Sequence, residues 1–272
     1  MAEKRKNILV GTSGYSYQDW KGPFYPADIS DRDMLAFYAR RFAAVEINFT
    51  YYRLPAARTM AAIARKGPAL SYAVKLTGDI THEGKLTKEL AADYRRGVQP
   101  MADAGVLACL LAQFPWRFKY SPSAIAFLKE IAGYFGDLKV VAEFRNDSWV
   151  NDEAFEELSK IKVGFCNVDE PGLKGLMPAT STATSAVGYF RFHGRNAKKW
   201  WRHEEAAERY DYLYSQQELE DWVPRIKEVA AKTQNTYVFM NNHPLGQAVT
   251  NAEMMMDMLG VAFEPPGDAS LF

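Results

Sequence analysis

Short apolar runs alternate with longer stretches of helical periodicity along almost the whole chain. Eight apolar or β-branched runs have the length of buried strands, at residues 8–11, 45–48, 72–75, 107–113, 140–144, 163–168, 189–193 and 237–241. The stretches that fit helices are residues 31–42, 57–66, 87–104, 122–135, 152–160, 216–232 and 247–259. Strand followed by helix, repeated in this way, predicts parallel strands joined by right-handed crossovers.

The number of these units predicts one α/β domain over residues 1–272, folded as a single (β/α)8 TIM-type barrel. A chain of 272 residues is close to the roughly 250 typical of such barrels. An open doubly wound sheet is the alternative, but no G-x-G-x-x-G follows the first strand. We expect an irregular unit after the sixth strand, a long loop at 194–215 after the seventh, and a tail from residue 263 that covers a barrel surface or end.

Composition narrows the cellular setting. Lys plus Arg and Asp plus Glu both number 33, so no bulk charge attracts nucleic acid or an anionic membrane. Cys109 and Cys166 lie inside apolar runs, which indicates buried, reduced thiols. No signal-peptide segment or membrane-length apolar stretch is found, so we expect a cytoplasmic protein. The oligomeric state is left open.

Polar side chains gather where the predicted strands end, which in a parallel barrel is the face that carries the active site. Because alternate residues share a face, Glu46 with Asn48, Glu143 with Arg145, and Arg191 with His193 are expected to point toward the barrel axis. The other strand-end groups are Lys75, Gln113, Asp169, Asn241 and Asn242. Burying so many charges is costly unless they pair, so they either serve function or form a structural ion-pair network.

Histidines and loop aromatics add candidate functional groups but do not identify the reaction. His82 and His243 follow strands and His193 ends one, each a candidate for proton transfer or ligation. A divalent metal is left open, although Lys75 and the arginines favour an anionic ligand held without metal. The aromatic and basic loop 194–215 fits either packing over the rim or the stacking of a base or sugar.

The strings GTSGYSYQDWKGPFYP, VEINFTYYRLP, AEFRNDSW, YFRFHGRN and NNHPLGQAVTNA together resemble the YecE-like family, a TIM-barrel family of unknown function numbered seventy-two. The resemblance extends from about residue 8 to residue 252. It singles out Glu46, Asn48, Tyr52, Lys75, His82, Gln113, Glu143, Arg145, Trp149, Asp169, Arg191, His193, Arg195, Asn241 and Asn242. The chain departs from the family's usual residues at Tyr15, Gly78 and Asn146, and the departures at Gly78 and Asn146 weaken an anion-binding or proton-transfer role for those two loops.

The favoured function is acid/base catalysis on a small anionic, phosphorylated or sugar-like molecule. Glu46, Lys75, Glu143 and His193 are expected to act in catalysis. The remaining eleven are expected to bind substrate: Asn48, Tyr52, His82, Gln113, Arg145, Trp149, Asp169, Arg191, Arg195, Asn241 and Asn242. The alternatives are a protein that binds or processes nucleic acid through its aromatic and basic loops, and a ligand sensor without turnover.

Overall fold

The computed structural model describes residues 7–261, and these form a closed barrel of eight parallel strands in sequence order. The ring closes where β1 pairs with β8. The strands are β1 (Ile8–Ser13), β2 (Ala44–Ile47), β3 (Ser71–Lys75), β4 (Leu107–Gln113), β5 (Val140–Glu143), β6 (Gly164–Asp169), β7 (Val187–Phe192) and β8 (Asn235–Met240). The predicted (β/α)8 barrel is therefore confirmed, and each predicted strand end lies within two residues of the observed one. The predicted tail from residue 263 lies outside the described residues.

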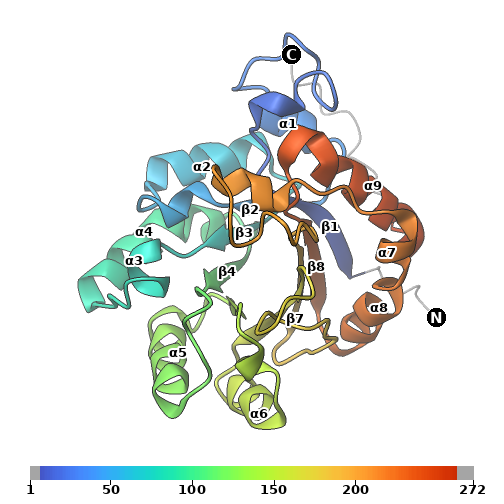
Figure 1. Cartoon of the computed structure of the whole chain (residues 1–272). Coiled ribbons are helices and arrows are strands. Elements are labelled where there is room, and N and C mark those ends of the chain that lie inside the picture. Colours follow the sequence, from blue (N-terminus) through green and yellow to red (C-terminus); the bar gives the residue numbers. More distant parts are fainter. Residues whose placement is uncertain (1–6, 262–272) are drawn as a thin grey trace, which may run out of the picture.

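The helices form a shell around the strands, as Figure 1 shows. They are α1 (Met34–Tyr38), α2 (Ala57–Lys66), α3 (Gly78–Thr81), α4 (Lys88–Asp103), α5 (Pro122–Phe135), α6 (Asp152–Lys160), α7 (Gln216–Glu220), α8 (Val223–Lys232) and α9 (Gln247–Leu259). Side chains of Thr87, Ser121 and Asn151 accept backbone N–H groups at the starts of α4, α5 and α6. None of the helices within residues 7–261 is long and apolar enough to cross a membrane.

Two predicted helices were too long. The stretch 216–232 is divided into α7 and α8, because Pro224 has no N–H to donate and its ring would clash with the carbonyl of Glu220. The stretch 31–42 keeps only α1, and turns flank it on both sides. The irregular unit after β6 is confirmed, since residues 170–186 contain no helix, and β7 is followed by a long loop with one short 3-10 helix, Ala206–Tyr210.

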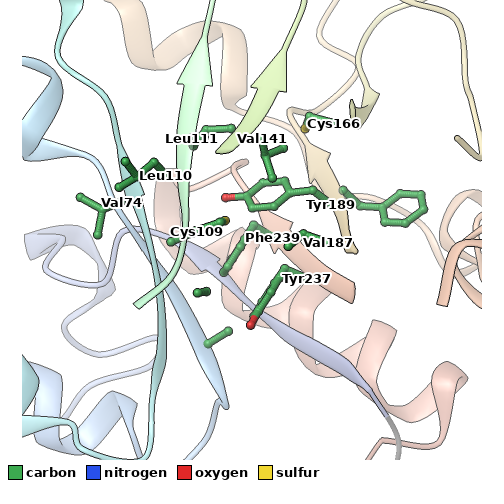
Figure 2. Close-up of a cluster of buried hydrophobic side chains, with 14 of the residues drawn as sticks. Val74, Cys109, Leu110, Leu111, Val141, Cys166, Val187, Tyr189, Tyr237 and Phe239 are labelled. Carbon is green, nitrogen blue, oxygen red and sulfur yellow. The ribbon is translucent and has the colours of Figure 1, made fainter. Parts of the chain in front are cut away.

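Aromatic side chains fill the lower half of the barrel. Tyr189, Tyr237 and Phe239 point into the interior beside Cys109 and Cys166, as Figure 2 shows. The rings of Tyr237 and Phe239 are stacked with centroids 6.2 Å apart. Both thiols are unpaired and fully buried, as predicted. This packed floor confines any ligand chemistry to the end of the barrel where the strands terminate.

Outside the sheet, the ring of Trp149 is stacked on Phe144 with centroids 3.7 Å apart. Its indole N–H donates to the backbone oxygen of Phe118 at 2.8 Å, and the side chain has no exposed surface. The structure therefore places Trp149 in the core between sheet and helices, away from the barrel mouth where a substrate would bind.

We predict that Trp149→Ala lowers the free energy of unfolding by about 3–5 kcal/mol, because it leaves a large cavity under Phe144. Trp201→Ala is the matched control, since 56% of that residue is exposed, and its effect is expected to stay within about 0.5 kcal/mol. Urea unfolding of the two variants measures the difference, and equal effects would contradict the packing described here.

Candidate functional site

Arg191 of β7 lies between two carboxylates that come from different walls of the barrel. Its Nη2 donates to Oε1 of Glu46 on β2 at 2.7 Å, and its Nη1 donates to Oε2 of Glu143 on β5 at 2.5 Å. Both carboxylates are fully buried and Arg191 is almost so. The predicted alternation is observed, because the intervening residues Phe144 and Phe192 pack outward against Trp149 and Trp222.

Glu46 has a partner on each carboxylate oxygen. The Ser13 hydroxyl at the end of β1 donates to Oε1, and the Tyr189 hydroxyl donates to Oε2 at 2.7 Å. Ser13 also accepts from Nη2 of Arg191 at 2.8 Å and from Nδ2 of Asn48 at 2.9 Å. Glu46 is therefore engaged by the protein itself and is poorly placed to accept a substrate proton.

Arg145 extends this arrangement to the end of β6. Its Nε donates to Oε1 of Glu143 at 2.5 Å and its Nη1 donates to Oε2 of Glu170 at 3.1 Å. Although burial alone would raise it, the charges of Arg145 and Arg191 hold the pKa of Glu143 well below its usual value. Burial raises the pKa of Glu170 to about 7, against the opposing charge of Arg145.

His193 completes the group that we call the mouth network, which consists of Ser13, Glu46, Glu143, Arg145, Glu170, Arg191 and His193. Nδ2 of Asn241 donates to Nδ1 of His193 at 2.9 Å, which leaves the ring proton on Nε2. Nε2 lies 3.2 Å from Oε1 of Glu143 but outside good hydrogen-bond geometry. Burial and the charge of Arg145 lower the pKa of His193 to about 3, so the ring is neutral at pH 7.

Lys75, at the end of β3, differs from the two arginines. Within residues 7–261, no carboxylate oxygen lies within 4.0 Å of its Nζ. Nζ lies instead 4.7 Å from the ring centroid of Tyr51, in the short 3-10 helix Phe49–Tyr51. Burial, together with the charge of Arg191, lowers the pKa of Lys75 to about 8.

The loop after β7 covers only part of the mouth. The ring of Trp200, which is 3% exposed, lies 5.8 Å from the Arg145 guanidinium, and Tyr210 packs 6.1 Å from His193. On the other side Lys75 is half-buried, and the His82 ring is 5.0 Å from Tyr51. The mouth is thus open on the side of β3 and closed on the side of β7.

A hollow of about 400 Å³ lies at the same end of the barrel, beside His82. It lies between the loops that follow β3 and β4, and its lining includes His82, Glu83, Arg117, Phe118 and Phe127. Two other hollows, of about 570 and 370 Å³, lie at the opposite end of the barrel beyond the aromatic floor. Only the first therefore adjoins the strand ends that carry polar groups.

Four of the predicted site residues lie outside the mouth. Asp169 faces the helices, where it accepts from Arg195, from the Tyr214 hydroxyl at 2.6 Å and from the Trp222 indole at 2.7 Å. Asn242 donates to the oxygens of Tyr212 and Asn251 on the same outer side. With Trp149 in the core, the set that anchors the outer layer is Trp149, Asp169, Arg195 and Asn242.

The remaining predicted residues divide into an inner group and a rim group. The inner group is Glu46, Asn48, Lys75, Glu143, Arg145, Arg191, His193 and Asn241. The rim group consists of Tyr52, which is 84% exposed, and the half-buried His82 and Gln113.

Sequence reasoning missed four members of this region: Ser13, Tyr51, Glu170 and Tyr189. Tyr189 lies in the predicted run 189–193 and shares the inward face of β7 with Arg191, so alternation could have found it. Extending the first predicted strand by two residues would have placed Ser13 at the end of β1.

The chemistry of the donor set bears on metal binding. Within residues 7–261, no group of three His, Cys, Asp or Glu side chains is arranged to hold a metal ion. The oxygens of Glu46 and Glu143 are engaged by arginines, whose charge would repel a cation. These residues therefore do not fit a divalent metal.

A family model described as "Protein of unknown function DUF72" matches residues 9–270. The chain belongs to the DUF72 family. It is similar to the UPF0759 protein YunF of Bacillus subtilis, with 28% identity over 94% of this chain and 96% of the relative. The resemblance drawn from the strand-end motifs is thereby confirmed.

Solved structures of the DUF72 family share the barrel. A family protein from Thermotoga maritima is 38% identical, with a TM-score of 0.85 over 93% of this chain and 99% of that one. Another from Enterococcus faecalis is 24% identical, with a TM-score of 0.84 over 96% and 99% of the two chains, and this likeness concerns the fold.

We predict that Glu143→Gln lowers the free energy of unfolding by about 3–5 kcal/mol, since it leaves two buried guanidinium groups undercompensated. The control is Glu228→Gln, which breaks an exposed pair with Lys232 and should cost less than about 1 kcal/mol. Chemical denaturation of both variants tests this expectation. A Glu143→Gln protein as stable as the control would show that the pairs do not hold the mouth together.

The raised pKa of Glu170 predicts a pH dependence of stability. Between pH 4.5 and pH 7 the folded protein retains a proton on Glu170 that the unfolded chain releases, so this group's contribution falls as pH rises. His193, whose pKa is lowered, acts in the opposite direction below pH 6.5, so the wild type alone is ambiguous. The stability of the wild type minus that of Glu170→Gln, measured across this range, should decrease with pH, and parallel curves would contradict the assignment.

Proposed function

We propose that the protein is an enzyme that binds a small anionic molecule, phosphorylated or sugar-like, at the open side of the barrel mouth. The observation that carries the proposal is Lys75, the half-buried cation at the mouth without a carboxylate partner within residues 7–261. Arg145 and Arg191 are already compensated by carboxylates, whereas Lys75 has its charge available for a ligand.

The electrostatics of the mouth network support an anion. Three cations, Arg145, Arg191 and Lys75, lie at the mouth with Glu46 and Glu143, which the arginines bind, and with Glu170, whose pKa of about 7 leaves it partly protonated near neutral pH. A partly desolvated site with a small excess of positive charge favours an anionic ligand. Glu46 and Glu143 contribute by positioning Arg191, rather than by transferring protons as first expected.

Lys75 also provides the acid/base chemistry in this proposal. Its pKa of about 8 lets it lose and regain a proton near physiological pH, where general acid/base groups are most effective. His82, whose pKa is lowered to about 4 by burial and by the charge of Lys75, is neutral there and can accept a hydrogen bond from the substrate.

The nucleic-acid alternative receives less support from the long loop. Trp200 and Tyr214 are 3% and 1% exposed, so they pack against the barrel instead of presenting a stacking surface. Trp201 remains exposed, with its ring edge-on to Trp116 at 6.2 Å. The mouth around Lys75 therefore carries the proposal.

We predict that Lys75→Met weakens binding of inorganic phosphate and of sugar phosphates by about 10- to 100-fold, the usual range for losing a charged hydrogen bond. Lys119→Met is the matched control, because its Nζ also lies over an aromatic ring, 5.2 Å from the centroid of Trp116, at the surface. Isothermal titration of the two variants measures the effect. Equal affinities for wild type and Lys75→Met would overturn the proposed anion site.

A further inference from the structure

Lys75 has the surroundings of a nucleophilic amine. Its Nζ lies 4.7 Å from the centroid of the Tyr51 ring, which takes up no proton and leaves the nitrogen lone pair available when the amine is neutral. The second cause of its lowered pKa, after burial, is the cation Arg191. Desolvation beside another cation is the arrangement that activates lysines for covalent catalysis.

The charges around Lys75 come from several elements. Arg191 and Arg145 disfavour its ammonium form, while Glu143 and Glu46 favour it. Since the arginines already bind Glu46 and Glu143, neither carboxylate is free to form an ion pair with Nζ by a small side-chain movement. With its pKa lowered to about 8, Lys75 is a cation in most molecules near pH 7 and a neutral amine in the remaining fraction, and only the neutral form can act as a nucleophile.

The hollow beside His82 indicates what the reacting molecule would carry. Nη2 of Arg117 donates to the backbone oxygen of His82 at 2.6 Å, and within residues 7–261 this guanidinium has no carboxylate within ion-pair distance. Burial and the charges of Lys75 and Arg117 lower the pKa of His82, whereas the carboxylate of Glu83, which lines the same hollow, acts in the opposite direction. Phe118 and Phe127 supply the apolar wall of the same hollow.

We propose that Lys75 forms an imine with the carbonyl carbon of a small aldehyde or ketone whose carboxylate or phosphate group is bound toward Arg117. The neutral Nζ attacks the carbonyl carbon, and the C=O π electrons become an oxyanion that takes up a proton. The nitrogen then loses its two protons while the carbinolamine C–O bond breaks. The products are C=N and one water that contains the carbonyl oxygen and, in net terms, both amine protons.

This inference rests on the proposed anion site and adds the substrate class to it. The half-buried His82 ring, neutral at pH 7, is the group placed to relay the protons, since it packs on the same Tyr51 ring as Lys75. No oxidant, reductant or metal enters these steps. The imine would then serve as an electron sink for bond changes at the neighbouring carbon.

The test uses glyoxylate, a minimal aldehyde that carries a carboxylate, with cyanoborohydride at pH 8 to reduce any imine that forms. Peptide mapping by mass spectrometry is expected to find one adduct per chain, at Lys75, with a mass gain equal to glyoxylate minus one oxygen. Exposed lysines should react at least about tenfold more slowly, because far fewer of them are neutral at this pH. Adducts spread over exposed lysines, with Lys75 unmodified, would overturn the inference.

Two variants separate the parts of the proposal. Lys75→Arg keeps the charge and lacks the nucleophile, so it should form no adduct at this position and still bind phosphate. Arg117→Met should slow labelling by glyoxylate about tenfold and leave labelling by acetaldehyde unchanged, since acetaldehyde has no anionic group. Equal slowing with both aldehydes would contradict the role of Arg117.

The failure of this inference is distinguishable from failure of the anion site. If phosphate binding depends on Lys75 but no adduct forms there, the anion site stands and the imine is excluded. If phosphate binding is also insensitive to Lys75→Met, both proposals fail. Thermal denaturation of each variant shows whether the barrel is intact in these comparisons.

Discussion

The bridge made by Arg191 between Glu46 and Glu143 is the constraint on which the barrel mouth depends. A guanidinium withdrawn from water needs compensating charge, and the two carboxylates supply it from β2 and β5 while Arg191 itself stands on β7. Three strands are thereby held at a defined spacing at the end of the barrel that has no aromatic filling. The Ser13 hydroxyl is bound into the same bridge and fixes the end of β1 to it.

The same bridge explains why Lys75 is chemically distinct. A lysine near Glu46 and Glu143 would ordinarily pair with them. The arginines bind these carboxylates instead, because a planar guanidinium can donate hydrogen bonds to two carboxylates at once. Burial and the positive charges of the arginines lower the pKa of Lys75, and its Nζ lies over the ring of Tyr51. The ion pairs thus stabilise Arg145 and Arg191 and leave Lys75 without a carboxylate partner among residues 7–261. Lys75 is therefore available to a ligand or to a reaction.

Sequence periodicity was sufficient for the barrel and for the inward face of the strands. Alternation correctly paired Glu143 with Arg145 and Arg191 with His193, since a strand offers only two faces. It did not identify Asp169 as outward-facing, because no signal in the sequence indicates which face of β6 points inward. Asp169 shares its face with Phe165, which packs against Phe155 of α6. Nor could alternation show that Glu46 is saturated by Ser13 and Tyr189, because those bonds join strands that are distant in sequence. Charge pairing is a tertiary property, and only the closed ring brings the partners together.

A hydrogen bond joins the two ends of the loop after β7, and we call this junction the neck of the loop. The Tyr214 hydroxyl accepts the N–H of Gly194 at 2.8 Å while it donates to Asp169 at 2.6 Å, so the two ends of the loop are fastened to each other and to β6. Closing the neck removes most of the conformational entropy that a loop of this length would otherwise keep. The segment between, which carries Trp200, is consequently held over Arg145 by contacts that are separate from the hydrogen bonds between the strands. Changing the residues of this segment would therefore alter the cover of the mouth and leave the pairing of the barrel strands as it is.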